Sequence, residues 1–141
     1  ADRSCHTFSI TGKAENVADI HREIDLFCQQ NGIPRNKGVL LAIAFEEAAF
    51  NIINHNEHVS MIDICLLLEE GSLIVRIRDD GAPFDPLAFV DDEDILQMNN
   101  IRLLERLTDQ KTYTRIMNMN NTVLSIKLEA AQNDGANDGT C

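Results

Sequence analysis

The sequence lacks the excess of basic residues that is typical of proteins binding nucleic acid. Lysine and arginine number 12 against 23 aspartates and glutamates, so the formal net charge is -11. Such a charge argues against a nonspecific grip on nucleic acid or on an anionic membrane, because both surfaces are also negative. We therefore expect no direct contact with nucleic acid or membrane, and a protein partner with a basic surface fits the charge better.

Paired cysteine motifs and long apolar runs are also lacking. The four cysteines are scattered, with no C-x-x-C and no histidine at finger spacing, which signals neither a zinc site nor a redox motif. Cys28 and Cys65 fall within apolar surroundings and are expected to be buried free thiols. Without an 18-residue apolar run or a charged-then-apolar leader, we expect a cytoplasmic protein with reduced thiols.

The length and composition predict one globular domain. A chain of 141 residues can bury about two thirds of its unfolded surface around a single core. Hydrophobic residues make up 44% and charged residues 25%, which are ordinary globular proportions. We place the domain at residues 1–129, and the polar, glycine-containing stretch 130–141 predicts a frayed tail.

The most informative stretch is a helix predicted over residues 34–56. Its apolar stripe repeats at spacings of four, three and four, at Leu41, Phe45, Ala48 and Ile52. Glu47, Asn51 and His55 form a second stripe, with each side chain about one turn beyond the last. Two oxygen donors one turn apart could hold a hard cation or its water shell. The helix alone, however, favours an ordinary surface pair between Glu47 and Asn51.

The periodicity elsewhere predicts the remaining elements in chain order. They are a strand at 7–10, a helix at 17–30, strands at 59–68 and 73–77, a helix ending near 108, and strands at 113–117 and 122–128 around a turn at 118–121. This order predicts an α+β fold, a two-layer α/β sandwich with three helices on one face of a mostly antiparallel sheet.

A carboxylate stands where the predicted sheet should be buried. Asp79 continues the parity of Leu73, Val75 and Ile77, so its side chain should point to the core side of the sheet. Burying a carboxylate there costs several kcal/mol unless a donor binds it. The stretch that follows is rich in turn residues, and Gly81 together with two prolines ends the strand.

Two blocks of residues carry a resemblance to a known family. Residues 47–55, reading E-A-A-F-N-I-I-N-H, look like the N box of the histidine-kinase-like (GHKL) ATPases, E-A-x-x-N-x-x-x-H. Residues 79–86, reading D-D-G-A-P-F-D-P, look like the first glycine box of that family, with its D-x-G core. The chain most closely resembles the small bacterial branch of anti-sigma factors that are also serine kinases, because residues 107–109 with Tyr113, Arg115 and Asn121 are similar to its closing helix and hairpin.

The resemblance implies that ATP lies between the helices and the sheet. Asn51 would coordinate Mg²⁺ bridging the phosphates, and Glu47 would polarise the attacking water or the substrate hydroxyl. Asp79 would accept a hydrogen bond from the adenine amino group, and Gly81 would let the backbone approach the base. Pro83 belongs to the same box and is expected beside the nucleotide.

The pattern departs from the family at the second glycine box. The matching residues 97–101 read Q-M-N-N-I, with Met98 and Asn100 where glycines are expected beside the phosphates. Side chains there hinder a close backbone approach, although Asn is the least unfavourable substitute, and we retain Asn100 as a candidate nucleotide contact. The lid before it, residues 87–96, is short, and the segment has no Lys or Arg before Arg102 to compensate.

Three functional hypotheses follow. The first is an ATP-binding regulator resembling anti-sigma factors, a serine/threonine protein kinase if its site is competent, whose partner is a sigma factor or an antagonist protein. The second is a degenerate, nucleotide-free binding module that acts by sequestration. The third, a fragment of a two-component kinase, is weaker because His6, His21 and His58 have no motif around them and are expected at the surface. Membership of the branch would also imply a homodimer.

Overall fold

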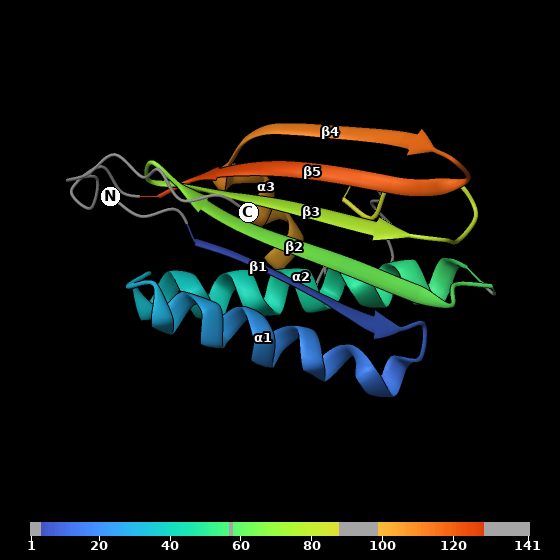
Figure 1. Ribbon diagram of the computed structural model, residues 1–141, viewed down its shortest axis with the longest axis horizontal. Helices are drawn as coiled ribbons and strands as arrows, with labels where there is room; N and C mark the ends of the chain where they lie inside the picture. The colour runs from blue at the N-terminus through green and yellow to red at the C-terminus, as the bar shows by residue number, and fades with distance from the viewer. Residues whose placement is uncertain (1–3, 57, 88–98, 129–141) are drawn as a thin grey trace.

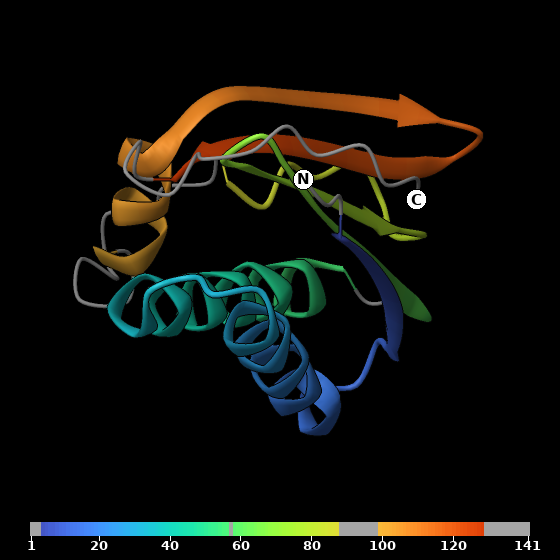
Figure 2. The same ribbon diagram turned by 60° about the vertical axis from the view of Figure 1, so that its left-hand side comes forward.

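The computed structural model describes residues 4–56, 58–87 and 99–128, and these form one sheet with helices packed on it (Figures 1 and 2). The helices are α1 (Val17–Gln30), α2 (Arg35–His55) and α3 (Asn99–Leu107), with a short 3-10 turn at Ala14–Asn16. The strands are β1 (Ser4–Thr11), β2 (Met61–Glu69), β3 (Ser72–Asp79), β4 (Thr108–Ile116) and β5 (Met119–Lys127). The predicted tail at 130–141 lies outside the described residues.

All four strand pairings in the sheet are antiparallel. The strand order is β1-β2-β3-β5-β4, which puts β3 in the middle. The helices lie together on one side of the sheet, with α1 against α2 and α2 against α3 (Figure 2). The predicted two-layer α+β architecture is therefore confirmed.

The helices form where apolar periodicity and end signals agree. Helix α1 begins and ends where the sequence predicted, and its buried side carries Val17, Ile20, Ile24 and Phe27. It stops because Gly32 adopts a φ of 70°, while the Ile33 amide donates to the Cys28 carbonyl. In α2 the predicted apolar stripe is fully buried, and Pro34 precedes its first turn.

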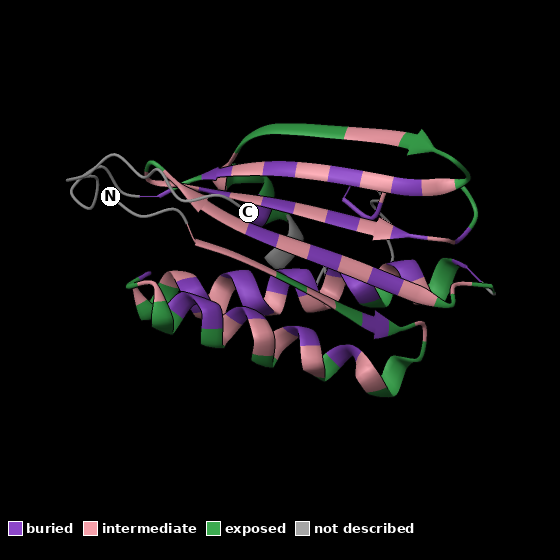
Figure 3. Ribbon diagram, in the orientation of Figure 1, coloured by how far each residue is buried: buried purple, intermediate pink, exposed green. Residues whose placement is uncertain are grey.

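Burial alternates along β2, β3 and β5 with a period of two (Figure 3). On β3 the buried positions are Leu73, Val75, Ile77 and Asp79, so the predicted inward direction of Asp79 is confirmed. The opposite face of the strand carries Ile74, Arg76 and Arg78. One strand thus delivers an aspartate to the helix-covered side and arginines to the other side.

The last hairpin differs from the prediction. Strand β4 begins five residues earlier than predicted, at Thr108, because this polar edge strand has no apolar alternation that would reveal it. The turn is confined to Met117 and Asn118, both with positive φ (53° and 63°), rather than spanning residues 118–121. Asn120 and Asn121 therefore belong to β5, where successive side chains face opposite sides.

Two of the cysteines, Cys28 and Cys65, are free thiols. Cys28 is a buried free thiol as predicted, and burial raises its pKa to about 11, with the nearby Asp25 charge adding to the shift. Cys65 is a free thiol but only half-buried, so the prediction that it is buried is wrong. Among the described helices, none has the length and apolarity needed to cross a membrane.

Candidate functional site

The buried carboxylate of Asp79 lies at the end of β3 with 1% of its surface exposed. Its Oδ1 accepts hydrogen bonds from the Gly81 amide and from Asn120 Nδ2, both at 2.9 Å. Asn120 is the direct partner of Asp79 in the pairing of β3 with β5. No described residue donates to Asp79 Oδ2, which leaves one oxygen of the carboxylate for another donor.

Asn120 is itself buried and connects the carboxylate to the loop after β3. Its Nδ2 also donates to the Ala82 carbonyl at 2.8 Å. Its Oδ1 accepts from Tyr113 Oη, from Arg115 Nη1 at 3.0 Å and from the Phe84 amide at 3.2 Å. A single amide side chain therefore holds the conformation of both Asp79 and the glycine-box loop.

Strand β4 supports the same loop from the edge of the sheet. Arg115 Nη1 donates to the Gly81 carbonyl at 2.9 Å, and Nη2 donates to the Asn118 carbonyl at 3.2 Å. The Phe84 amide also donates to Tyr113 Oη at 3.1 Å. Tyr113 and Arg115, selected from the sequence only as part of a family resemblance, are thus positioning residues for the loop.

The C-terminal end of α2 meets this loop, which brings the two predicted motifs together. The His55 ring stacks on the Phe84 ring, with centroids 5.0 Å apart and planes 10° apart. A Cβ at Gly81 would lie only 2.6 Å from Val59 Cγ2 and 2.8 Å from Asn56 Cγ. A larger residue at this position would therefore force the Val59 and Asn56 side chains to move.

Asn56, which follows α2, is a polar residue that the sequence reasoning missed. It is 6% exposed, and its Nδ2 donates to the Ile52 carbonyl at 2.9 Å. Its Oδ1 is buried and has no hydrogen-bond partner among the described residues. Asn56 thus closes the end of the helix and places an acceptor oxygen beside Gly81.

Glu47 and Asn51 are half-buried one turn apart on α2, the helix whose end contacts the loop. The described residues contain no group of three or more His, Cys, Asp or Glu side chains that could hold a metal ion. A preformed cage is not needed for Mg²⁺, which proteins usually hold through one or two side chains together with substrate phosphates. The donor set on α2 is compatible with that mode of binding.

The remaining predicted site residues are Pro83 and Asn100. Pro83 is exposed in the loop. Asn100 lies in the first turn of α3, so its backbone is helical, while its side chain and the whole of Met98 lie outside the described residues. The roles toward a nucleotide stay predictions for all the candidate residues, which are Glu47, Asn51, Asp79, Gly81, Pro83 and Asn100.

The pKa values of Asp79 and Asp80, at the end of β3, are shifted in opposite directions. Burial raises the pKa of Asp79 above its usual value, although the hydrogen bonds from Asn120 and Gly81 oppose the shift. Burial also acts to raise the pKa of Asp80, but hydrogen bonds from Ser60 and the Met61 amide outweigh it and lower that pKa. Asp79 is thus the carboxylate for which an additional donor is most favourable.

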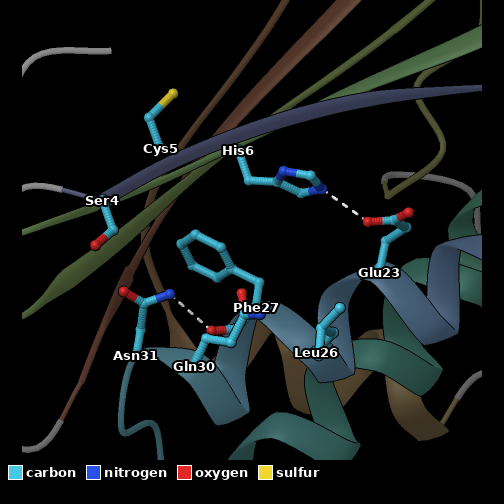
Figure 4. Close-up of a pocket in the computed structure, with 8 residues that line it drawn as sticks. All are labelled: Ser4, Cys5, His6, Glu23, Leu26, Phe27, Gln30 and Asn31. Carbon is cyan, nitrogen blue, oxygen red and sulfur yellow. Dashed lines mark hydrogen bonds and ion pairs between the residues drawn. The ribbon is translucent and has the colours of Figure 1, made fainter.

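A cavity of about 340 Å³ lies elsewhere, between β1 and α1 (Figure 4). In the sheet register Ser4 pairs with Leu68 and Asp79 pairs with Ile62, so the cavity and the carboxylate are at opposite ends of β2. Its lining includes His6, whose Nε2 contacts Glu23 Oε2 at 2.7 Å. His6 also stacks with Phe8 and Phe27, while its side chain stays 40% exposed, in line with the expected surface position.

Comparison with known proteins identifies a family for most of the chain. A family model described as a histidine kinase-like ATPase domain matches residues 10–127. The match contains α2, the loop after β3 and the closing hairpin. No curated protein matches the chain.

We predict that Asn120→Ala lowers the free energy of unfolding by about 2 to 4 kcal/mol, because it leaves the buried Asp79 and several loop groups without their partner. Urea denaturation at neutral pH measures the loss. The matched control is Asn121→Ala, since this side chain makes a single 3.5 Å hydrogen bond to Thr114 and should change stability by about 0.5 kcal/mol or less. Equal losses in the two variants would contradict the role given to Asn120.

The raised pKa of Asp79 predicts a pH-dependent effect of Asp79→Asn. The stability linked to its proton is full below the unfolded pKa of about 3.9 and is lost as the pH rises through the higher folded pKa. Asn does not ionise, so the stability of the variant minus that of the wild type should increase from about pH 4 toward neutrality.

Asp80→Asn is the control with the opposite sign. The folded pKa of Asp80 is lowered, so its contribution is present above the unfolded pKa and lost as the pH falls through the folded pKa. The stability of this variant minus that of the wild type should decrease with rising pH. Urea denaturation at several pH values measures both differences, and a flat or reversed trend for Asp79→Asn would contradict the assignment.

Proposed function

Since the chain belongs to the histidine kinase-like ATPase domain family, we propose that it binds ATP with Mg²⁺ and regulates a protein partner in the manner of anti-sigma factors. Proteins of this family in general use ATP and Mg²⁺. The observation that carries the proposal for this chain is the buried Asp79, whose Oδ1 is held by the protein and whose Oδ2 receives no donor from the described residues.

The carboxylate is suited to recognise the adenine base. An exocyclic amino group is a donor, and it would give Asp79 Oδ2 the hydrogen bond that burial makes favourable. The network through Asn120 and Arg115 already holds the carboxylate and the Gly81 backbone in place, which reduces the cost of ordering these groups when the base binds. At the position of this amino group guanine presents a carbonyl acceptor instead, so guanine bound in the same orientation would be disfavoured by the carboxylate.

The phosphate end of the site rests on α2. We assign Asn51 to hold Mg²⁺ and Glu47 to orient the attacking water or the substrate hydroxyl, one helical turn away. When bound, Mg²⁺ neutralises charge on the phosphates during phosphoryl transfer. Asn100 in the first turn of α3 is the proposed contact from the opposite side, and Pro83 from the loop.

The proposed activity is phosphorylation of a Ser or Thr on an antagonist protein, combined with binding of a sigma factor or of that antagonist. Support comes from the sequence of α2, from the first glycine box, and from the way Tyr113 and Arg115 hold that loop. We also propose that the protein works in the cytoplasm and as a homodimer, as the resemblance to the branch implies.

A second candidate function is sequestration of the same kind of partner without nucleotide. Two observations favour it. The space next to Gly81 is filled by Val59 and Asn56. Asn100, which replaces a glycine of the second glycine box, has a helical backbone. Both features reduce the room for close backbone approach to a ligand. Nucleotide binding separates this candidate from the first.

We predict that wild-type protein binds ATP·Mg²⁺ and that Asp79→Asn weakens the binding at least 100-fold, because an amide donor then faces the adenine amino group. Isothermal titration calorimetry measures the affinity. GTP·Mg²⁺ serves as the matched ligand and should bind at least 100-fold more weakly than ATP·Mg²⁺. Absence of heat at millimolar ATP, with the protein folded, would favour the sequestration module.

Glu47→Gln separates catalysis from binding. We expect the variant to release phosphate from ATP at least 100-fold more slowly while its affinity for ATP·Mg²⁺ stays within about 3-fold, because the carboxylate acts on the nucleophile. Glu46→Gln, at the neighbouring half-buried position on α2, is the control. Loss of ATP binding in Glu47→Gln with unchanged turnover per bound nucleotide would contradict the assigned role.

A further inference from the structure

Two arginines stand on the face of the sheet that the helices leave uncovered. Arg76 and Arg78 are two residues apart on β3, and they alternate with the buried Val75 and Ile77. This spacing puts their Cα atoms about 6.6 Å apart on one face. Their neighbours across β5 are Val123 and Asn121.

The positive charge at this place is only partly compensated. Arg78 Nη2 contacts Asp63 Oδ2 on β2 at 3.3 Å. The side chain of Arg76 makes no hydrogen bond or ion pair with the described residues, although the whole sequence carries a net charge of -11. The Nε atoms of both arginines are buried and lack partners among the described residues. Buried donors without acceptors are unfavourable, so an added anion would stabilise this arrangement.

An apolar surface adjoins the arginines at the turn between β4 and β5. Ile116 is 55% exposed and Met117 is 91% exposed. Together with Met119 and Asn121, these residues and the two arginines line a cavity of about 240 Å³. Methionine side chains adapt to the shape of different apolar groups and are common at binding surfaces. The cavity thus combines guanidinium groups with adaptable apolar walls.

We propose that this arginine–methionine pocket (Arg76, Arg78, Ile116, Met117, Met119 and Asn121) docks a segment of a partner protein in which a carboxylate stands close to a large apolar side chain. The carboxylate pairs with the Arg76 guanidinium, whose planar fork suits two parallel hydrogen bonds. The apolar side chain packs on Ile116 and Met117. Charge complementarity selects an acidic segment, because the pocket is a local positive site with an uncompensated cation.

The pocket is separate from the nucleotide site within the same sheet. Asp79 and Arg78 are consecutive on β3 and therefore point to opposite faces. The proposal extends the partner-binding part of the proposed function, yet it does not depend on ATP. Peptide binding is therefore measured without nucleotide, so that failure of ATP binding and failure of the pocket are distinguishable.

The probe is a library of random 12-residue peptides displayed on phage, from which peptides that bind the full-length chain are selected. We expect the enriched peptides to carry Asp or Glu within a few positions of Leu, Ile, Met or Phe. Synthetic copies of them should bind at least 10-fold more weakly to Arg76→Glu and Arg76→Gln, and at least 5-fold more weakly to Met117→Ser. Lys13→Glu and Leu26→Ser, at exposed positions elsewhere, should stay within 2-fold.

Several results would overturn the proposal. One is that no peptides are enriched relative to selection on an unrelated acidic protein. Another is that the enriched peptides share no carboxylate. A third is that the Arg76 and Met117 variants bind the peptides as tightly as the wild type does. Light scattering tests whether the pocket is occupied by a second copy of this chain instead. If the wild type is a dimer and Met117→Ser makes it dissociate, a second copy covers the pocket. Urea denaturation of each variant ensures that a loss of binding is not a loss of folding.

Discussion

The hydrogen bond between Asp79 and Asn120 is the interaction on which the candidate site depends. A carboxylate at the buried end of β3 destabilises the fold unless donors surround it, and β5 supplies one directly across the register. The same Asn120 then accepts from Tyr113 and Arg115 and bonds to the loop after β3. The conformation of that loop is therefore determined by the sheet, because strands β4 and β5 hold it.

The loop in turn connects the sheet to α2. Stacking of His55 on Phe84 and the close approach of Asn56 to Gly81 bring the end of the helix against the loop. Glu47 and Asn51 lie on the preceding turns of this helix, so their position relative to the loop follows from contacts at its end. In this arrangement the base recognition proposed for Asp79 and the phosphate binding proposed for α2 are linked through one packed junction.

Much of this could be predicted from sequence because the signals are local. The bounds of α1 follow from apolar periodicity and the Asn31-Gly32 stop, and the inward direction of Asp79 follows from strand parity. Strand β4 was predicted to begin five residues too late because its polar edge residues do not alternate. Asn120 was assigned to a turn, since nothing local distinguishes it from Asn118, and its role arises from pairing with a residue 41 positions away. Asn56 was missed for the same reason, because its environment depends on Gly81.

The central claim is that Asp79 receives the adenine amino group, and the ionisation of its carboxyl group tests this most directly. The carboxyl carbon of Asp79 can be followed by NMR over a pH titration, with Asp79→Asn used to assign the signal. We predict that the pKa of Asp79 lies above the usual aspartate value in the free protein and is lower with saturating ATP·Mg²⁺, because the new donor favours the charged form. A pKa that stays unchanged with nucleotide bound would contradict it.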